Sequence, residues 1–186
     1  MPWKRILGFL MVLLCLSGCG KSEGPTQKAL DFRTALMQEE GCSFTADITA
    51  DYGDKLYVFS VSAECSGDET KITVLSPDSI AGIVATVSEN GAKLSFEDTC
   101  LDFGKLANGY VSPVSVPWLL YRCWIGEYIA YAGADGDLER ITYLKGYNKQ
   151  EVTLDTWLSA DGVPVHAEVL YDGVRCLTIE IKDFQY

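Results

Sequence analysis

The sequence holds few of the residues that enzymes use for catalysis. It has 186 residues and a single histidine, His166, which any serine or cysteine triad would have to use. Gly-x-Ser-x-Gly, His-Glu-x-x-His and glycine-rich phosphate-binding motifs are all missing. The absence of Cys-x-x-Cys argues against thiol oxidoreductase chemistry. We therefore expect a protein that is not an enzyme and that has no catalytic residues and no cofactor.

Ligands for metal ions are equally scarce. Asp135, Asp137 and Glu139 are the best candidates, because calcium prefers several oxygen ligands. Their spacing lacks the twelve-residue loop of an EF-hand, so we interpret them as a solvated turn and predict no metal site. His166 lies between Val165 and Ala167 in an alternating segment, which places it on the polar face of a strand.

Positive charge is in short supply as well. The chain has 15 basic and 26 acidic residues, a formal net charge of −11. Nucleic-acid binding depends on clustered lysine and arginine that neutralise phosphates, so we expect no nucleic-acid partner. The same charge argues against electrostatic adhesion to anionic lipid.

The sequence also lacks an apolar run long enough to span a membrane. The longest apolar run, Ile6 to Leu16, has only 11 residues, whereas a helix needs roughly 20 to cross a bilayer. Lys4 and Arg5 precede the run, so it reads as an export signal. It ends in Leu-Ser-Gly-Cys, which resembles the lipobox of bacterial lipoproteins. An ordinary secretory signal with an incidental cysteine is the alternative interpretation.

The lipobox resemblance implies a lipid anchor. In that family the cysteine thiol is joined to diacylglycerol and the chain is cut just before it, so Cys19 would begin the mature protein. Several acyl chains, such as palmitate, would hold it to the bilayer. The predicted location is the extracytoplasmic face of the cell membrane. The predicted organisation is a signal peptide at 1–18, a tether at 19–26 and a single domain at 27–186.

The domain begins with a helical pattern and then changes period. Residues 25–37 have apolar side chains at helical spacing, with Pro25 allowed in the first turn and Gly41 placed as a stop. Segments 42–49 and 57–65 alternate with a period of two and predict a β-hairpin that turns at 52–55.

Matching the apolar faces of that hairpin fixes its register. Residue 44 then lies opposite residue 63, and the same register places Cys42 opposite Cys65. Facing strand positions lie about 4.5–5.5 Å apart at Cα, within reach of a disulfide. We therefore predict a disulfide between Cys42 and Cys65. Cys100 with Cys123 is a second pairing, which would leave Cys176 as a free thiol; an odd number of cysteines remains after cleavage.

Alternating segments continue to the end of the chain. Further strands are predicted at 70–75, 80–87, 93–97, 128–132, 138–145, 149–158, 163–171 and 174–184, with a short piece at 101–103. A short, very apolar helix opens near Pro117. In the last hairpin, a three-residue loop at 172–174 pairs Val169 with Leu177 and Ala167 with Ile179, whereas a two-residue loop would mix the two faces.

This order of elements resembles the LolA/LolB-like fold, which RseB-type periplasmic regulators share. The resemblance rests on the lone N-terminal helix, the turn at Leu75-Ser76-Pro77-Asp78-Ser79-Ile80 and the closing hairpin from Asp161 to Phe184. It implies an α+β, mainly β fold: a curved antiparallel half-barrel of about 10–11 strands, with the N-terminal helix and the short central helix over its concave face. It also implies an apolar cavity between sheet and helices that takes acyl chains.

Two functions follow from this resemblance. The first is an anchored module that binds a lipid or another hydrophobic ligand, although an anchored relative cannot ferry cargo between membranes. The second is a non-enzymatic envelope interaction or regulatory protein with no ligand cavity. Candidate cavity-lining residues are Phe44, Ile48, Tyr57, Phe59, Val61, Phe96, Trp118, Trp124 and Trp157, although aromatic residues at strand spacing are usually plain core.

Overall fold

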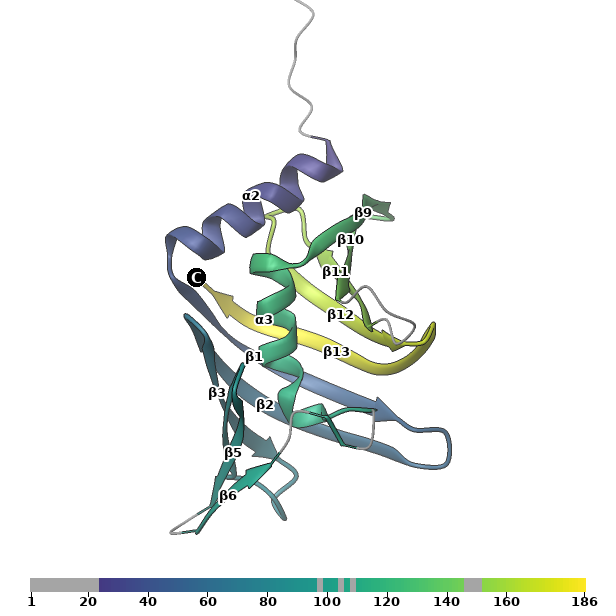
Figure 1. The fold of residues 1–186 in the computed structure, drawn as a ribbon. Coiled ribbons are helices and arrows are strands. Elements are labelled where there is room, and N and C mark those ends of the chain that lie inside the picture. The colour runs from purple at the N-terminus through teal and green to yellow at the C-terminus, as the bar shows by residue number, and fades with distance from the viewer. Residues whose placement is uncertain (1–23, 97–98, 104–105, 108–109, 146–151) are drawn as a thin grey trace, which may run out of the picture.

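The computed structural model describes residues 24–96, 99–103, 106–107, 110–145 and 152–186. The predicted signal peptide and the predicted lipid attachment at Cys19 lie outside these residues. The described part is built on one large antiparallel sheet and two helices (Figure 1).

The sheet has eleven strands in the order β6-β5-β4-β3-β2-β1-β13-β12-β11-β10-β9, and every neighbouring pair is antiparallel. A separate two-stranded sheet pairs β7 with β8. The fold is α+β and mainly β, as the sequence predicts. The strands are β1 (Gly41–Asp51), β2 (Leu56–Ser66), β3 (Glu69–Ser76), β4 (Val84–Ser88), β5 (Gly91–Phe96), β6 (Thr99–Phe103), β7 (Leu106–Ala107), β8 (Tyr110–Val111), β9 (Tyr128–Asp135), β10 (Leu138–Lys145), β11 (Val152–Leu158), β12 (Pro164–Tyr171) and β13 (Val174–Gln185).

Two helices accompany the sheet. The N-terminal helix α2 (Pro25–Gln38) has a proline in its first turn and ends shortly before β1. A 3₁₀ turn, η1 (Pro113–Ser115), leads into the central helix α3 (Val116–Gly126), one residue before the predicted start at Pro117. Within the described residues, no helix is long and apolar enough to cross a membrane.

The first hairpin confirms the register predicted from its apolar faces. Phe44 pairs with Ala63, and Cys42 pairs with Cys65. Two strand boundaries were wrong by three residues or more: β9 ends at Asp135 rather than at residue 132, and β4 begins at Val84 rather than at residue 80. Residues 77–83 instead form a turn that closes on β3, with Gly82 at φ 85° donating its backbone N–H to the Val74 carbonyl.

The closing hairpin corrects the predicted loop. Tyr171 pairs with Val174, so the loop has two residues, Asp172 and Gly173, both at positive φ. The inner pairs Ala167 with Ile179 and Val169 with Leu177 nevertheless form as predicted, because the register shifts between Val169 and Leu170. This β-bulge absorbs the extra residue on β13 and keeps both apolar sets on one face.

Candidate binding site

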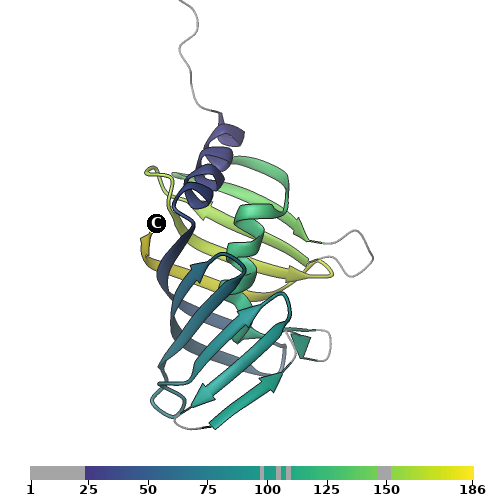
Figure 2. The ribbon, with the colours of Figure 1, turned by 60° about the vertical axis from the view of Figure 1, so that its left-hand side comes forward.

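The central helix α3 occupies the middle of the concave face of the sheet. It contacts β2 and β3 on one side and β10 on the other, and Figure 2 shows it between the two halves of the sheet. Almost all of its side chains are buried: Val116, Pro117, Trp118, Leu119, Leu120, Tyr121, Cys123 and Trp124. The apolar face of the sheet is thus largely covered by the helix.

Trp124 is the centre of this packing. Its side chain is fully buried and its indole N–H donates a hydrogen bond of 2.9 Å to the Thr156 hydroxyl on β11. Its ring lies 5.5–6.1 Å from the rings of Phe32, Phe44 and Phe184, at edge-on or tilted angles that aromatic pairs favour. One side chain therefore joins α3 to α2, β1, β11 and β13.

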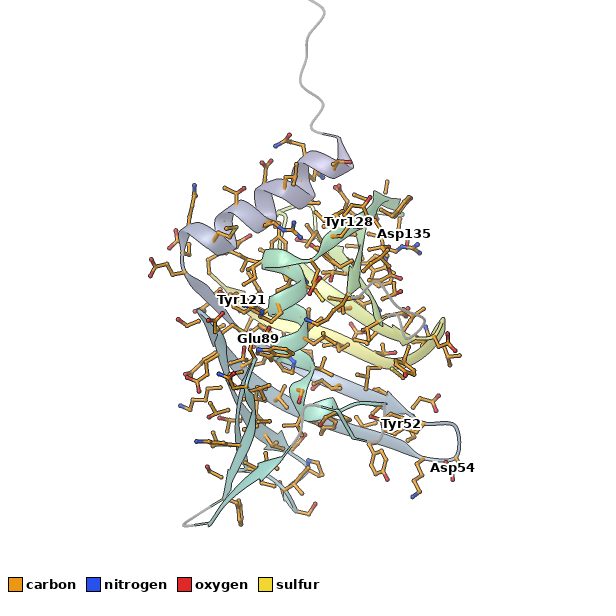
Figure 3. The ribbon with its side chains drawn as sticks, in the orientation of Figure 1. Tyr52, Asp54, Glu89, Tyr121, Tyr128 and Asp135 are labelled. Atoms are coloured by element: carbon orange, nitrogen blue, oxygen red, sulfur yellow. The ribbon has the colours of Figure 1, made fainter. Side chains whose placement is uncertain are left out.

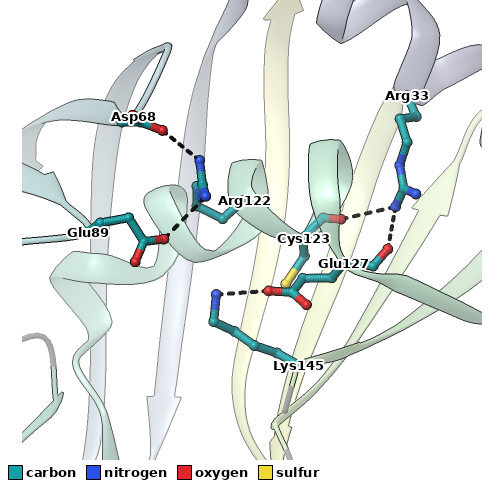
Figure 4. Close-up of polar contacts among 7 residues, drawn as sticks. All are labelled: Arg33, Asp68, Glu89, Arg122, Cys123, Glu127 and Lys145. Carbon is teal, nitrogen blue, oxygen red and sulfur yellow. Dashed lines mark hydrogen bonds and ion pairs between the residues drawn. The ribbon is translucent and has the colours of Figure 1, made fainter. Parts of the chain in front are cut away.

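Arg33 of α2 holds the C-terminal end of α3 (Figure 4). Its guanidinium donates to the backbone carbonyls of Trp124 at 2.7 Å, Glu127 at 2.6 Å and Cys123 at 3.4 Å. The last carbonyls of a helix have no partner within the helix, and the negative end of the helix dipole lies there. A cation at this end therefore donates hydrogen bonds to the carbonyls and offsets the negative charge. Arg33 therefore couples the position of α3 to that of α2.

Two further cations fix α3 to the sheet (Figure 4). Arg122 pairs with Asp68 in the β2–β3 turn at 2.9 Å and with Glu89 in the β4–β5 turn at 3.3 Å. Lys145 of β10 pairs with Glu127 at 3.1 Å on the other side. The helix is thus held at its sides by ion pairs and at its end by hydrogen bonds.

The residues predicted to line a cavity fall into two groups. Tyr57 and Phe96 are 49% and 47% exposed. Trp157 lies beside His166, with their ring centroids 4.9 Å apart, and donates its indole N–H to Asp135. The other six are buried in the core between the sheet and the helices: Phe44, Ile48, Phe59, Val61, Trp118 and Trp124.

An open groove lies between α2, α3 and the β2–β3 turn. Its volume is about 470 Å³, within the roughly 300–1,000 Å³ typical of ligand sites. Leu36 and Tyr121 are buried beneath it, and the pKa of Tyr121 is raised, mainly by burial. Met37, at 62% exposure, is the most open apolar side chain along it. The residues around it are Leu36, Met37, Glu40, Ser66, Gly67, Asp68, Tyr121, Arg122, Ile125 and Gly126.

The sequence did not predict this groove. Its apolar residues Leu36, Met37, Tyr121 and Ile125 come from two helices about ninety residues apart, and only the docking of α3 against α2 brings them together. Helical spacing placed Met37 in the apolar stripe of α2, whereas the structure leaves it 62% exposed beside the groove, so the spacing carried no signal for this site.

The cysteine pair lies near this groove. Cys42 and Cys65 lie opposite each other as buried thiols. The neighbouring Cys65 and burial raise the pKa of Cys42 far above its usual value. Their disulfide stays a prediction. Burial raises the pKa of Cys123 to about 12, and the side chain of Cys100 lies outside the described residues.

The remaining polar candidates make ion pairs and hydrogen bonds with neighbouring side chains. His166 Nδ1 lies 2.9 Å from a Glu180 carboxylate oxygen, and its Nε2 lies 3.6 Å from Glu168. Asp135 accepts from Trp157, and Glu139 pairs with Lys28 at 3.2 Å. Within the described residues no three His, Cys, Asp or Glu side chains lie close enough to hold a metal ion.

No protein-family model and no curated protein sequence matches this chain. Solved structures that are similar to it include the following three. A LolA superfamily protein from Nitrosomonas europaea is 9% identical, with a TM-score of 0.47 over 88% of this chain and 94% of that one. A putative outer membrane lipoprotein-sorting protein domain from Vibrio parahaemolyticus is 10% identical, with a TM-score of 0.48 over 85% and 90%.

The third similar chain comes from the structure of the CwlD amidase from Clostridioides difficile in complex with the GerS lipoprotein. It is 17% identical, with a TM-score of 0.44 over 89% of this chain and 98% of that one. At 9–17% identity and TM-scores below 0.5, the likeness concerns the overall course of the chain and says nothing about function.

Proposed function

We propose that this protein is a lipid-anchored extracytoplasmic binding protein that holds an apolar ligand in the groove between α2, α3 and the β2–β3 turn. The observation that carries the ligand site is the groove of about 470 Å³ with Leu36, Met37 and Ile125 along it. Apolar side chains from both helices meet there next to open space. The ligand is an acyl chain or a similar apolar group. Its binding is favourable because it removes the apolar surfaces of Met37 and Ile125 from water.

The anchor is proposed from the sequence. Lys4, Arg5, the 11-residue apolar run and Leu-Ser-Gly-Cys together form a lipoprotein signal that ends at Cys19. Cells that express the full chain are labelled with radioactive palmitate, and Cys19→Ser is labelled in parallel. Label in the unmodified chain that is lost in Cys19→Ser supports the anchor; no label on either chain refutes it.

The groove is tested on the Cys19→Ser protein, which carries no acyl anchor. Lipids that copurify are identified by mass spectrometry, and binding of the fluorescent fatty acid cis-parinaric acid is titrated. Met37→Glu places a carboxylate in the groove next to Glu40 and Asp68, so the affinity should fall by about tenfold or more. Leu30→Glu is the matched control, since Leu30 is exposed on the same helix but outside the groove. No copurifying lipid and no binding of the probe would overturn the proposal.

The second candidate function is an interaction or regulatory protein of the cell envelope. It is favoured by the burial of nearly every α3 side chain against the concave face, where a carrier would place its cargo. Both functions work by binding, and we propose that the protein performs no catalysis. The position of His166 supports this, because the single histidine of the sequence lies on β12, outside the groove.

A further inference from the structure

A second hollow lies where two hairpins turn. Because β1 pairs with both β2 and β13, the β1–β2 turn and the β12–β13 turn lie at the same end of these neighbouring strands. Figure 3 labels Tyr52 and Asp54 in the first of these turns. The hollow between the turns measures about 420 Å³, again within the range of ligand sites. We call it the hairpin pocket; it is lined by Asp51, Tyr52, Gly53, Tyr171, Asp172, Val174 and Cys176.

Aromatic rings form much of this pocket and its rim. Tyr52 and Tyr171 line it, and the ring of Tyr57 lies 6.3 Å from that of Tyr52. Burial is the main cause that raises the pKa of Tyr52, so its phenol stays neutral at physiological pH. Aromatic faces carry negative electrostatic potential and attract cations. The rings therefore favour a positively charged group.

The carboxylates of the pocket add to this preference. Asp51 and Asp172 both line it, and one Asp51 oxygen accepts the Gly53 backbone N–H at 2.9 Å. Two basic residues lie close in sequence to the residues that line the pocket. Arg175 is paired with Glu168 at 2.6 Å, and Lys55 is an exposed residue of the turn. With one of these cations already paired, the pocket presents an excess of negative charge.

Two exposed apolar side chains form a rim at the pocket. Val174, which lines it, is 68% exposed, and Tyr57, whose ring lies beside that of Tyr52, is 49% exposed. Exposed apolar side chains that gather around a polar pocket are typical of protein interfaces, in which one anchor side chain enters the pocket and its neighbours exclude water. A small free cation would leave Val174 and Tyr57 exposed to water, which favours a protein as the source of the charge.

We propose that the hairpin pocket receives a lysine or arginine side chain from a protein partner, with Tyr52 and Tyr171 against the cation, Asp51 and Asp172 neutralising it, and the apolar rim packing around it. The pocket lies at the end of β1 remote from α2. The inference is independent of the ligand groove.

Peptide titrations followed by two-dimensional NMR test this inference on the Cys19→Ser protein. The probes are a short apolar peptide with one central lysine, the same peptide with norleucine in its place, and tetramethylammonium chloride. We expect the lysine peptide to shift the amide signals of Gly53 and Gly173. The norleucine peptide should bind with an affinity at least about tenfold lower, and added salt should lower the affinity of the lysine peptide.

Isosteric variants separate charge from fold. Asp51→Asn with Asp172→Asn keeps the acceptor for Gly53, and asparagine tolerates the φ of 50° at position 172. The affinity for the lysine peptide should fall by about tenfold or more, whereas Asp54→Asn, in the same turn but outside the pocket, should change it less than about twofold. Equal binding of both peptides, binding of tetramethylammonium alone, or no binding would each overturn the proposal. Met37→Glu should leave this binding unchanged, which separates it from the proposed function.

Discussion

The two hollows of this protein lie at opposite ends of one hairpin and differ in chemistry. The groove adjoins the end of β1–β2 at Glu40 and Ser66, and the hairpin pocket adjoins the end at Asp51 and Tyr52, about 30 Å away along the strands. Their volumes, about 470 and 420 Å³, are similar. Helices wall the first and provide aliphatic side chains, whereas turns wall the second and provide tyrosines and carboxylates.

The comparison teaches that the two hollows depend on different parts of the fold. The groove exists only while α3 is docked against α2, because both helices contribute its walls. The hairpin pocket depends on the register of β1, β2, β12 and β13, which backbone hydrogen bonds fix independently of the helices. Variants that loosen α3 should therefore damage the groove first.

The largest effect is expected from Trp124→Ala. Removing a buried tryptophan leaves a cavity and typically costs about 3–5 kcal/mol of unfolding free energy, a large share of the roughly 5–15 kcal/mol of a domain. Urea denaturation of the Cys19→Ser protein measures it. Trp124→Phe is the control, since it keeps a ring among Phe32 and Phe44 and loses mainly the hydrogen bond to Thr156. Equal, small losses in both variants would contradict the docking of α3 described above.

The next effect concerns the predicted disulfide beside the groove. A bond between Cys42 and Cys65 would close a loop of about 24 residues and contribute about 3.5 kcal/mol in the chain-entropy model. We expect reductant to lower the urea midpoint of the protein isolated without reductant, and Cys42→Ala with Cys65→Ala to remove that sensitivity. Non-reducing peptide mapping checks the bond directly. Recovery of both thiols in alkylated form from native protein would show that the prediction is wrong.

Local sequence patterns predicted the helix and the strands that surround the groove and the hairpin pocket, but they did not predict either site. Alternating apolar residues were enough to pair Phe44 with Ala63, because a shift of one residue would turn every apolar side chain toward solvent. The helix at 25–38 was equally readable from its spacing and its proline. These features depend on neighbours within a few residues or within one hairpin.

Features that depend on distant segments were not predictable. The two-residue loop at Asp172 and Gly173 is possible because a bulge near Cys176 corrects the register, and nothing in the apolar pattern requires that bulge. Arg33 reads as a solvated helix residue until α3 presents its terminal carbonyls to it.

Trp157 is a different case, because it shares a face of β11 with Thr153 and Asp155, opposite the buried Leu154 and Leu158. Alternation alone therefore argued against the predicted cavity position, and its ring lies against His166 instead.

A smaller and more selective effect is expected from Arg33→Met. The variant keeps much of the aliphatic bulk but leaves the carbonyls of Trp124 and Glu127 without their charged donor, a loss of about 1.5–3 kcal/mol. Hydrogen exchange should rise in α3 and change little in the β1–β2 and β12–β13 turns. Arg122→Met is the comparison variant; its carboxylate partners are exposed, so it should cost less than about 1 kcal/mol. Uniform loss of protection across the molecule would show that the two hollows are not independent.

The smallest effect lies midway between the two hollows, on β1. Asp47 pairs with Lys182 of β13 at 2.5 Å, and its pKa is lowered from 3.8 first by Lys182 and then by the Ser60 hydroxyl. A lowered pKa means that the ionised form stabilises the folded state. The contribution is therefore present above about pH 4 and is lost as the pH falls through the pKa of Asp47 in the folded state.

Both side chains are about half exposed, so water and salt screen the pair and Lys182→Gln should barely move the urea midpoint at pH 7. The midpoints of the parent and Lys182→Gln, followed from pH 7 down to pH 3, should converge in the acid range. A gap that widens toward pH 3 would show that another group controls stability in the centre of the sheet.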